Sequence, residues 1–384
     1  MIKKRILVVD DSCVYQRLLS DVINAHNDLE VVGVASNGKI ALSMMNQLQP
    51  DLVTLDILMP EMDGIQALIE LRKSWQNVKI IMVSSLTSGS SDVALDALAL
   101  GASEAVAKPR SVHGSNNVRR NLTNDLLPKI EAVCGIPSKR LPAKTSVSID
   151  PPKAINALGK IVRRSATADG IDLVAIGVST GGPNALARLL PNIPADIGVP
   201  IVIVQHMPAE FTTQLARQLD KASSLKVIEA QHGDKLRAGS VYIAPGNYHM
   251  VLDRIRADVI VTLNSNVPEH SYRPAVDPLF RSIPPIYGHK CLGVIMTGMG
   301  ADGLKGSEVL SAAGCPIIVQ DKSTSTVYGM PKLVAMAGLA DKQLALNKMA
   351  GAITAYVKGS PLGRSRTAAN SDNYKQTTIS GGCS

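Results

Sequence analysis

Short apolar runs alternate with amphipathic segments throughout the first hundred residues. Each run of Ile, Leu and Val predicts a buried strand, and apolar residues that recur every three or four positions predict the helix after it. The expected strands span residues 6–9, 31–34, 52–55, 79–83 and 105–107, and the expected helices span 14–22, 40–48, 65–71, 93–100 and 115–133. Five strand–helix units in a row predict a doubly wound parallel sheet.

A second strand–helix series begins near residue 172. Its expected strands span 172–176, 200–205, 241–243, 259–263 and 291–296, and its expected helices span 184–190, 211–219 and 307–313. The predicted fold class is therefore α/β, with two doubly wound parallel-sheet domains. We predict a first domain over 1–134, a linker over 135–168, a second domain over 169–358 and a flexible tail over 359–384, which is polar and lacks apolar periodicity.

Length and composition support two globular domains. The chain has 384 residues, of which 45% are hydrophobic, and this excludes wholesale disorder. No apolar run approaches the roughly 18 residues of a membrane-spanning helix, and the first apolar stretch ends at Asp10, too soon for a signal-peptide core. Five scattered cysteines without a Cys-x-x-Cys pair argue against a disulfide framework. We therefore expect a cytoplasmic protein without membrane insertion.

The net charge of +8 is concentrated in the predicted linker. Residues 1–108 hold nine basic and thirteen acidic residues, whereas residues 135–168 hold seven basic residues and one acid. A basic stretch can bind nucleic acid, but we favour a solvated linker between the domains. Only eleven aromatic residues occur in the chain, which makes a base-stacking surface improbable. We expect no nucleic-acid partner.

Polar groups follow four of the predicted strands in the first domain. Asp10 and Asp11 follow the first strand, Asp56 the third, Ser84 the fourth and Lys108 the fifth. Ligands gather at this edge of an open parallel sheet, and clustered carboxylates favour an oxygen-preferring dication such as Mg²⁺. A single strand-end Asp commonly caps the next helix, but five groups at matched strand ends favour a site for Mg²⁺ and a phosphoryl group.

These groups lie in motifs that resemble the receiver domain of bacterial response regulators. The motifs are Leu7-Val-Val-Asp-Asp11, Asp56-Ile-Leu-Met-Pro60, Met62-Asp-Gly64 and Lys108-Pro109. The resemblance implies that Asp56 accepts phosphate. It also implies that Asp10 and Asp11 help Asp56 to hold Mg²⁺. Ser84 and Lys108 would then contact the phosphoryl oxygens.

In the second domain, residues 177–181 read Gly-Val-Ser-Thr-Gly and fit the pattern G-x-S-x-G between a strand and a helix. The glycines permit a sharp turn that exposes the Ser179 hydroxyl, and the helix offers amides to developing negative charge. Such a turn can instead cradle a phosphate. No Walker lysine follows and G-x-G-x-x-G is absent, which weakens the alternative of a nucleotide-binding domain.

A serine nucleophile needs a base, and the base needs an orienting acid. His206 and Asp302 each come shortly after a predicted strand, so both are expected at the same edge of the sheet as Ser179. His249 or His270 could serve in place of His206. Asp302, which stands among glycines, could simply form a turn.

Five segments of the second domain look like the methylesterase domain of the chemotaxis CheB family. They are Gly177-Val-Ser-Thr-Gly-Gly182, Val204-Gln-His-Met-Pro208, Val241-Tyr-Ile-Ala-Pro245, Tyr272-Arg-Pro-Ala-Val-Asp277 and Thr297-Gly-Met-Gly-Ala-Asp-Gly303. A receiver before this domain is the architecture of that family. The resemblance implies Ser179 as nucleophile, His206 as general base and acid, and Asp302 as orienting carboxylate. It implies that the Met299 backbone amide helps to form the oxyanion hole.

The same resemblance implies the activity and the partners. The chain would be a phosphorylation-regulated hydrolase of γ-glutamyl methyl esters on methyl-accepting chemoreceptors, and it would deamidate receptor glutamines by the same chemistry. A chemotaxis histidine kinase would donate phosphate, and ester hydrolysis would need no metal. Two positions depart from the family patterns: Ala105, where receivers often carry an aromatic switch residue, and Ala301, where the CheB family commonly has Asn.

The main alternative is a response regulator whose second domain binds DNA or another macromolecule without catalysis. The basic linker is its support. A helix-turn-helix output would show a compact run of helices, whereas residues 170–345 are rich in predicted strands and punctuated by glycine.

Overall fold

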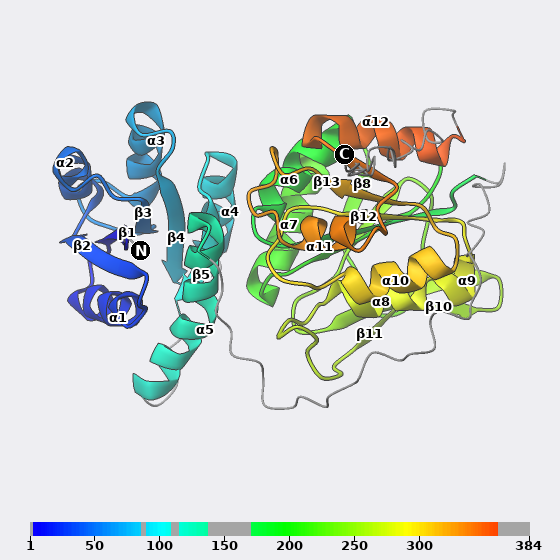
Figure 1. Ribbon diagram of the computed structural model, residues 1–384, viewed down its shortest axis with the longest axis horizontal. Helices are drawn as coiled ribbons and strands as arrows, with labels where there is room; N and C mark the ends of the chain where they lie inside the picture. Colours follow the sequence, from blue (N-terminus) through cyan, green and yellow to red (C-terminus); the bar gives the residue numbers. More distant parts are fainter. Residues whose placement is uncertain (1–2, 86–89, 109–114, 137–169, 360–384) are drawn as a thin grey trace, which may run out of the picture.

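A computed structural model describes residues 3–85, 90–108, 115–136 and 170–359 (Figure 1). It contains two α/β units, one on each side of the predicted linker. Apart from residues 135, 136 and 359, the predicted linker and tail lie outside the described residues. The proposed domain boundaries therefore stay predictions.

The first unit is a five-stranded parallel sheet in the order β2–β1–β3–β4–β5. Its strands are β1 (Lys4–Val9), β2 (Leu29–Ala35), β3 (Leu52–Asp56), β4 (Lys79–Ser85) and β5 (Glu104–Lys108). Its helices are α1 (Cys13–Asn24), α2 (Gly38–Leu48), α3 (Gly64–Ser74), α4 (Ser90–Ala99) and α5 (Ser115–Cys134). All ten elements match predicted ones, with ends shifted by a few residues.

Helices cover both faces of this sheet because alternate strand residues point to opposite sides. Ile6 and Val8 of β1 belong to one buried cluster with residues of α1 and α5. Leu7 and Val9 belong to another cluster with residues of α2, α3 and α4. This explains why the strands read as nearly continuous apolar runs.

The second unit is a seven-stranded parallel sheet in the order β14–β13–β12–β6–β7–β9–β8. Its strands are β6 (Leu173–Val178), β7 (Ile201–Gln205), β8 (Lys226–Glu229), β9 (Ser240–Ile243), β12 (Cys291–Ile295), β13 (Ile317–Gln320) and β14 (Lys342–Leu344). One cluster joins it to α6 (Gly182–Leu189), α7 (Ala209–Ala222) and α12 (Leu346–Val357). The other joins it to α8 (Val276–Ser282), α10 (Leu304–Ala312) and α11 (Met330–Met336). Two short helices, η2 (Leu190–Asn192) and α9 (Pro284–Tyr287), complete the unit.

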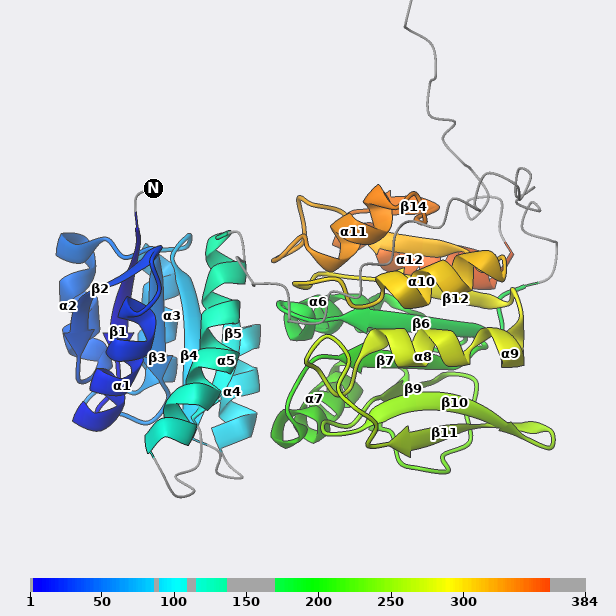
Figure 2. The same ribbon diagram turned by 60° about the horizontal axis from the view of Figure 1, so that its bottom comes forward.

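The predicted strand over 259–263 is present but does not join the parallel sheet. It forms β11 (Asp258–Asn264), which pairs antiparallel with β10 (His249–Ile255) in a separate ribbon beside α8 (Figure 2). Only residues 256 and 257 connect the two strands, and such a short connection permits antiparallel pairing alone, because parallel strands need a long crossover. In the described part of the chain no helix is both long enough and apolar enough to cross a membrane.

The two units meet through α4, which packs against α6 and α7 (Figure 1). Asn184 Nδ2 of α6 donates to the Ala102 carbonyl, 3.2 Å away, just after α4. Gln218 Nε2 of α7 donates to Asp96 Oδ1 of α4 at 2.6 Å. The apolar cluster that includes α4 also runs through both units. The first unit therefore packs against α6 and α7, the helices that follow the carboxyl ends of β6 and β7.

Candidate active site

Ser179 stands in the turn between β6 and α6. Gly181, the residue just before α6, has φ +76°, a conformation that costs glycine little and other residues much. Gly182 N donates to Ser179 O at 2.7 Å, and Ser179 N donates to Thr297 O at 2.9 Å. The turn is therefore fixed both internally and to the segment after β12.

His206 follows β7 and contacts Ser179 directly. His206 Nδ1 lies 3.1 Å from Ser179 Oγ, and His206 Nε2 lies 2.6 Å from Asp302 Oδ2. The geometry fits the tautomer in which Nε2–H donates to Asp302, because Nδ1 is then free to accept the serine proton. The structure thus brings together the three side chains that the sequence placed at strand ends.

Asp302 is held by the start of α8 as well as by His206. Val276 N donates to Asp302 Oδ2 at 2.7 Å, and the amides of Asp277 and Gly303 donate to Oδ1 at 3.0 and 2.9 Å. Burial disfavours the charged carboxylate, but these hydrogen bonds, with that of His206, outweigh it and lower the pKa of Asp302. Asp302 is therefore a fixed anion behind the imidazole.

The two alternative histidines have other partners. His249 Nε2 lies 3.1 Å from Val267 O, and His249 Nδ1 accepts from Ala275 N at 3.3 Å. His270 Nε2 lies 2.9 Å from Asp277 Oδ2. Among the three candidates, His206 is the one whose ring nitrogen contacts the Ser179 hydroxyl.

One expectation about Ser179 was wrong. The turn was predicted to expose its hydroxyl, but the residue is only 4% exposed. The segment after β12 passes close by, so that a Cβ added to Gly298 would lie 2.8 Å from Ser179 Cβ. Met299, the predicted oxyanion donor, is the next residue and is half-buried.

Two residues of the site were missed by sequence reasoning. Gln205 is buried, and its Nε2 donates to the carbonyls of Ser179 (3.0 Å) and His206 (3.1 Å). Tyr272 stacks on the His206 ring, with centroids 4.1 Å apart. Both residues lie inside motifs that resemble the CheB family, but only the folded chain reveals what they touch.

The acidic cluster of the first unit also assembles at one edge of its sheet. Lys108 Nζ lies 2.7 Å from Asp10 Oδ2 and 2.7 Å from Asp56 Oδ2. Oxygens of Asp10, Asp11 and Asp56 all lie within 4.8 Å of one another. Ser84 is buried on β4, one step beyond Val83, which pairs with Asp56. All five predicted residues are thus at the carboxyl edge of the sheet.

The balance of charges in this acidic cluster favours the binding of a dication. Burial raises the pKa of Asp56, and the neighbouring Asp10 adds to the effect, although Lys108 opposes it. Burial disfavours the Lys108 ammonium, but its contacts with Asp10 and Asp56 outweigh this and raise the pKa of Lys108. Three carboxylates thus face one ammonium, and a set of carboxylate oxygens is what Mg²⁺ prefers.

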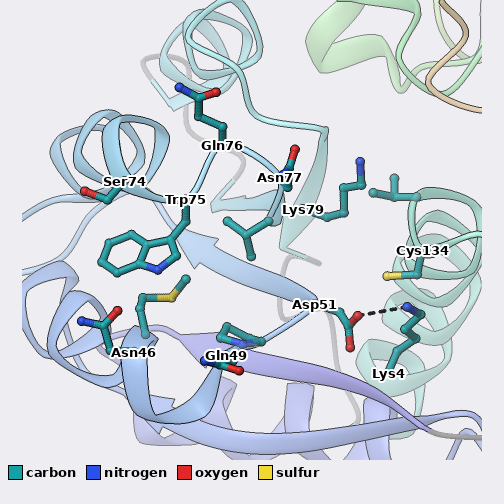
Figure 3. A pocket seen from close by; sticks show the side chains of 14 residues that line it. Lys4, Asn46, Gln49, Asp51, Ser74, Trp75, Gln76, Asn77, Lys79 and Cys134 are labelled. Carbon is teal, nitrogen blue, oxygen red and sulfur yellow. Dashed lines mark hydrogen bonds and ion pairs between the residues drawn. The ribbon is translucent and has the colours of Figure 1, made fainter. Parts of the chain in front are cut away.

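A pocket of about 550 Å³ opens at the opposite edge of the first sheet (Figure 3). The Trp75 ring and the ion pair between Lys4 Nζ and Asp51 Oδ1 (2.9 Å) line it, together with Cys134 at the end of α5. The pocket lies at the amino ends of β1 and β4, whereas Asp10 and Asp56 lie at carboxyl ends. It is therefore separate from both candidate sites.

A receiver-type sheet joined to a sheet that carries a Ser–His–Asp constellation defines a class of proteins, the response regulators with a hydrolase domain. Residues 6–114 match the response regulator receiver domain, and residues 174–353 match the CheB methylesterase. The protein-glutamate methylesterase/protein-glutamine glutaminase of Trichodesmium erythraeum is 41% identical over 353 residues, which are 91% of this chain and 98% of that protein. The protein of the same name from Desulfotalea psychrophila is 44% identical over 359 residues, 92% and 98% of the two chains. This chain belongs to the CheB family.

The chain is also similar to a solved structure, the CheB methylesterase catalytic domain of Thermotoga maritima. The two are 41% identical, the match covers 48% of this chain and 98% of that one, and the TM-score is 0.47. The residues that the structure describes do not support the alternative of a helix-turn-helix output domain, because the second unit is a seven-stranded parallel sheet. The basic stretch that supported that alternative lies almost wholly outside the described residues.

Proposed function

We propose that this chain is a phosphorylation-regulated protein-glutamate methylesterase and protein-glutamine glutaminase. It hydrolyses γ-glutamyl methyl esters of methyl-accepting chemoreceptors, and it deamidates receptor glutamines. The continuous hydrogen-bonded path from Ser179 through His206 to Asp302 carries this proposal. The names of the relatives that match over nine tenths of the chain support the substrate class.

Ser179 is the nucleophile in this mechanism. Its Oγ attacks the ester carbonyl while His206 Nδ1 takes the proton, and Asp302 stabilises the imidazolium through Nε2–H. The imidazolium then protonates the leaving oxygen, which departs as methanol, or the leaving nitrogen of a glutamine, which departs as ammonia. His206 next takes a proton from water, whose oxygen attacks the glutamyl–serine ester, and returns that proton to Ser179 Oγ as the C–O bond to the serine breaks. Positioned proton transfer of this kind supplies about 10²–10⁴-fold in rate.

We assign the Met299 backbone amide to the developing oxyanion. Met299 follows Gly298, whose Cα approaches Ser179 so closely that a Cβ would collide with it. The donor therefore belongs to a segment in contact with the nucleophile. One such donor supplies about 10²–10³-fold in rate. We expect hydrolysis to need no metal, since this chain's own groups perform each proton transfer.

Asp56 is the residue that we expect to carry phosphate, with a chemotaxis histidine kinase as donor in the cytoplasm. Asp10, Asp11 and Asp56 would hold Mg²⁺, which neutralises charge on the phosphoryl oxygens when it is bound. Lys108 and Ser84 would contact the phosphoryl group. Lys108 already bridges Asp10 and Asp56, so it must exchange one carboxylate for a phosphoryl oxygen.

The placement of the first unit suggests how phosphorylation acts. Helix α6 begins three residues after Ser179, and α7 begins three residues after His206. Both helices carry the hydrogen bonds to the α4 region, through Asn184 and Gln218. We propose that the unphosphorylated receiver restricts access of a bulky receptor to this edge. Phosphorylation of Asp56 then shifts the population toward an open arrangement.

Release of methanol from membranes that carry methyl-labelled chemoreceptors tests the proposal. The full chain should release labelled methanol, and more of it when a small phosphodonor and Mg²⁺ are present. Ser179→Ala should abolish release while Asp56 is still phosphorylated, and Asp56→Asn should keep the basal rate but lose the response. Wild-type release in Ser179→Ala would reject the assigned nucleophile. Equal rates for the full chain and for residues 160–384, with and without phosphodonor, would reject the regulatory part.

A further inference from the structure

A second imidazole–carboxylate pair lies behind the proposed triad. His270 Nε2 is 2.9 Å from Asp277 Oδ2 and 3.9 Å from Asp302 Oδ1. One ligand atom from each of these three residues lies within 4.8 Å of the others. Asp277 N also donates to Asp302 Oδ1, so the two carboxylates are tied through the same backbone unit. The proposed triad uses neither His270 nor Asp277.

Two carboxylates at this spacing need a nearby cation. Asp277 and Asp302 are 1% and 2% exposed, and like charges in such surroundings repel strongly. Glu269, from the turn that carries His270, adds a third carboxylate. Arg281 of α8 forms a two-pronged ion pair with Glu269, and its charge also acts on Asp277 and Asp302. His270 is the basic side chain that contacts Asp277 directly.

The chemistry of His270 agrees with its position. Its hydrogen bond to Asp277 raises its pKa, burial opposes this, and the charges of Asp302, Asp277 and Glu269 raise the pKa further. The ring is about one third exposed, so solvent can deliver and remove its proton. The imidazolium is therefore favoured above the pH at which an isolated histidine would lose its charge.

The backbone around His270 is in an unfavourable conformation. His270 and Ser271 have φ +52° and +70°, and Glu269 and Tyr272 exchange two backbone hydrogen bonds across them. Consecutive non-glycine residues in the left-handed region cost conformational energy and persist where surrounding contacts impose them. This turn directs the His270 ring to Asp277 and the Tyr272 ring onto His206. The second contact reaches the catalytic imidazole directly, and the first reaches Asp277, whose backbone amide donates to Asp302.

We propose that His270 is a positioning residue whose imidazolium balances the buried Asp277–Asp302 pair and so keeps Asp302 ionised and aimed at His206. Asp277 relays the effect, because its side chain holds His270 and its amide holds Asp302. His270 exchanges no proton with the substrate. The inference rests on the proposed triad, but it makes a separate statement about charge.

The proposal predicts a specific dependence on pH. The imidazolium is present below the raised pKa of His270 and is lost as the pH rises through it, which leaves the two buried carboxylates without the cation that contacts Asp277 directly. Turnover should therefore decline on the alkaline side, with a midpoint above the ordinary histidine value of about 6.5. Removal of Asp277's charge should lower that midpoint, and removal of His270 should abolish this decline.

The test measures kcat and KM of the full chain between pH 6 and 9 on chemoreceptor-bearing membranes. His270→Asn suits it because Asn tolerates the left-handed conformation and does not titrate. At pH 7 we expect kcat to fall about tenfold, the effect of one pKa unit of lost interaction, with KM nearly unchanged and the alkaline decline gone. Asp277→Asn, which can still accept from Gly306 N, should move the decline to lower pH. Ser271→Asn, in the same turn, should behave like the wild type.

A second measurement keeps this inference separate from the proposed activity. NMR titration of the His270 ring needs no substrate, and its midpoint should lie above 6.5 in the wild type and fall in Asp277→Asn. A His270→Asn variant with wild-type kcat and an unchanged alkaline decline would overturn the positioning role. An NMR midpoint that Asp277→Asn leaves in place would overturn the charge balance. Absence of methanol release from the wild type would instead count against the proposed function, and the titration would still decide this point.

Discussion

The imidazole of His206 lies flat against the ring of Tyr272, with 4.1 Å between centroids and 8° between planes. The ring nitrogens of His206 point along this plane to Ser179 and Asp302. The stack therefore limits tilting of the base without using either nitrogen. Offset or parallel ring contacts of this kind are worth about 0.5–1.5 kcal/mol beyond the area that they bury.

Replacement of Tyr272 should separate ring stacking from hydrogen bonding. We expect Tyr272→Phe, which keeps the ring, to retain most of kcat. Tyr272→Ala should lower kcat about two- to tenfold, the range that corresponds to the stacking energy. Methanol release under saturating substrate measures both. A full loss of activity in Tyr272→Phe would show that the hydroxyl, rather than the ring, supports His206.

Gly298 tests how tightly the segment after β12 fits Ser179. A Cβ at this position would lie 2.8 Å from Ser179 Cβ and 2.5 Å from Met330 Sδ, so Gly298→Ala must displace the segment or the serine. A shift of about 1 Å at a reacting group can cost about 10²-fold in rate. We expect a fall of that order in kcat and unchanged phosphorylation of Asp56.

The matched control is Gly351→Ala, in α12. A Cβ there meets no atom within 4 Å, and Ala is favoured over Gly inside a helix by roughly 0.5–1 kcal/mol. Activity should be unchanged and thermal stability equal or slightly higher. Loss of activity in both variants would point to a general sensitivity of the fold rather than to the site.

The hydrogen bond between Gln218 and Asp96 tests the contact between the two units. Its removal in Gln218→Ala should favour the open arrangement and raise the basal rate of the unphosphorylated chain about two- to tenfold, the range for one net hydrogen bond. Arg217→Ala, on the exposed side of the same helix, is the control and should change nothing. If Gln218→Ala lowers the basal rate, the contact supports catalysis instead of restricting it.

Asp56 gives a prediction for stability against pH. Since burial raises its pKa in the folded state, the ionised carboxylate destabilises the receiver at pH 7, and Asp56→Asn should raise the unfolding temperature. The gain should be full above the folded pKa and vanish below the unfolded value of about 3.8, where Asp56 is neutral in both states. Thermal unfolding from pH 3 to 8 measures it. A gain that is constant over this range would reject the charge as its cause.

Added Mg²⁺ should reverse the order of the two proteins. A ligand at one hundred times its Kd stabilises the folded state by about 2.7 kcal/mol. We expect this for the wild type and a smaller effect for Asp56→Asn, which has one carboxylate fewer. Equal stabilisation of both would place the ion elsewhere.

The strands and helices that the sequence predicted are those with strong periodicity. All ten elements of the first unit were found, because each strand there is buried on both faces and reads as an apolar run. In the second unit, four strands were missed: β8, β10, β13 and β14. Three of them have only four, four and three residues and hardly differ from apolar loops, and the fourth, β10, has seven residues but ends in exposed and mostly charged positions. The strand over 259–263 was found, but its pairing was not, because an apolar run contains no information about its neighbour.

The residues of the candidate active site were also predicted only in part. Ser179, His206 and Asp302 stand in recognisable motifs at strand ends, so their meeting could be expected. The position of His270, in contrast, could not be predicted. The sequence offered it as a substitute base, and the fold instead places it on Asp277, behind the carboxylate of the triad.

The sequence alone determined the two parallel sheets and the edge of each sheet at which polar groups gather, because strand periodicity and chain direction are local properties. Only the tertiary structure decided which histidine contacts Ser179, that the serine is covered, and that α4 lies against α6 and α7. These facts depend on distances between residues tens of positions apart, from Ser179 and His206 to Asp96 and Gln218. Such distances follow from how the helices pack on the sheets, and no short stretch of sequence encodes them.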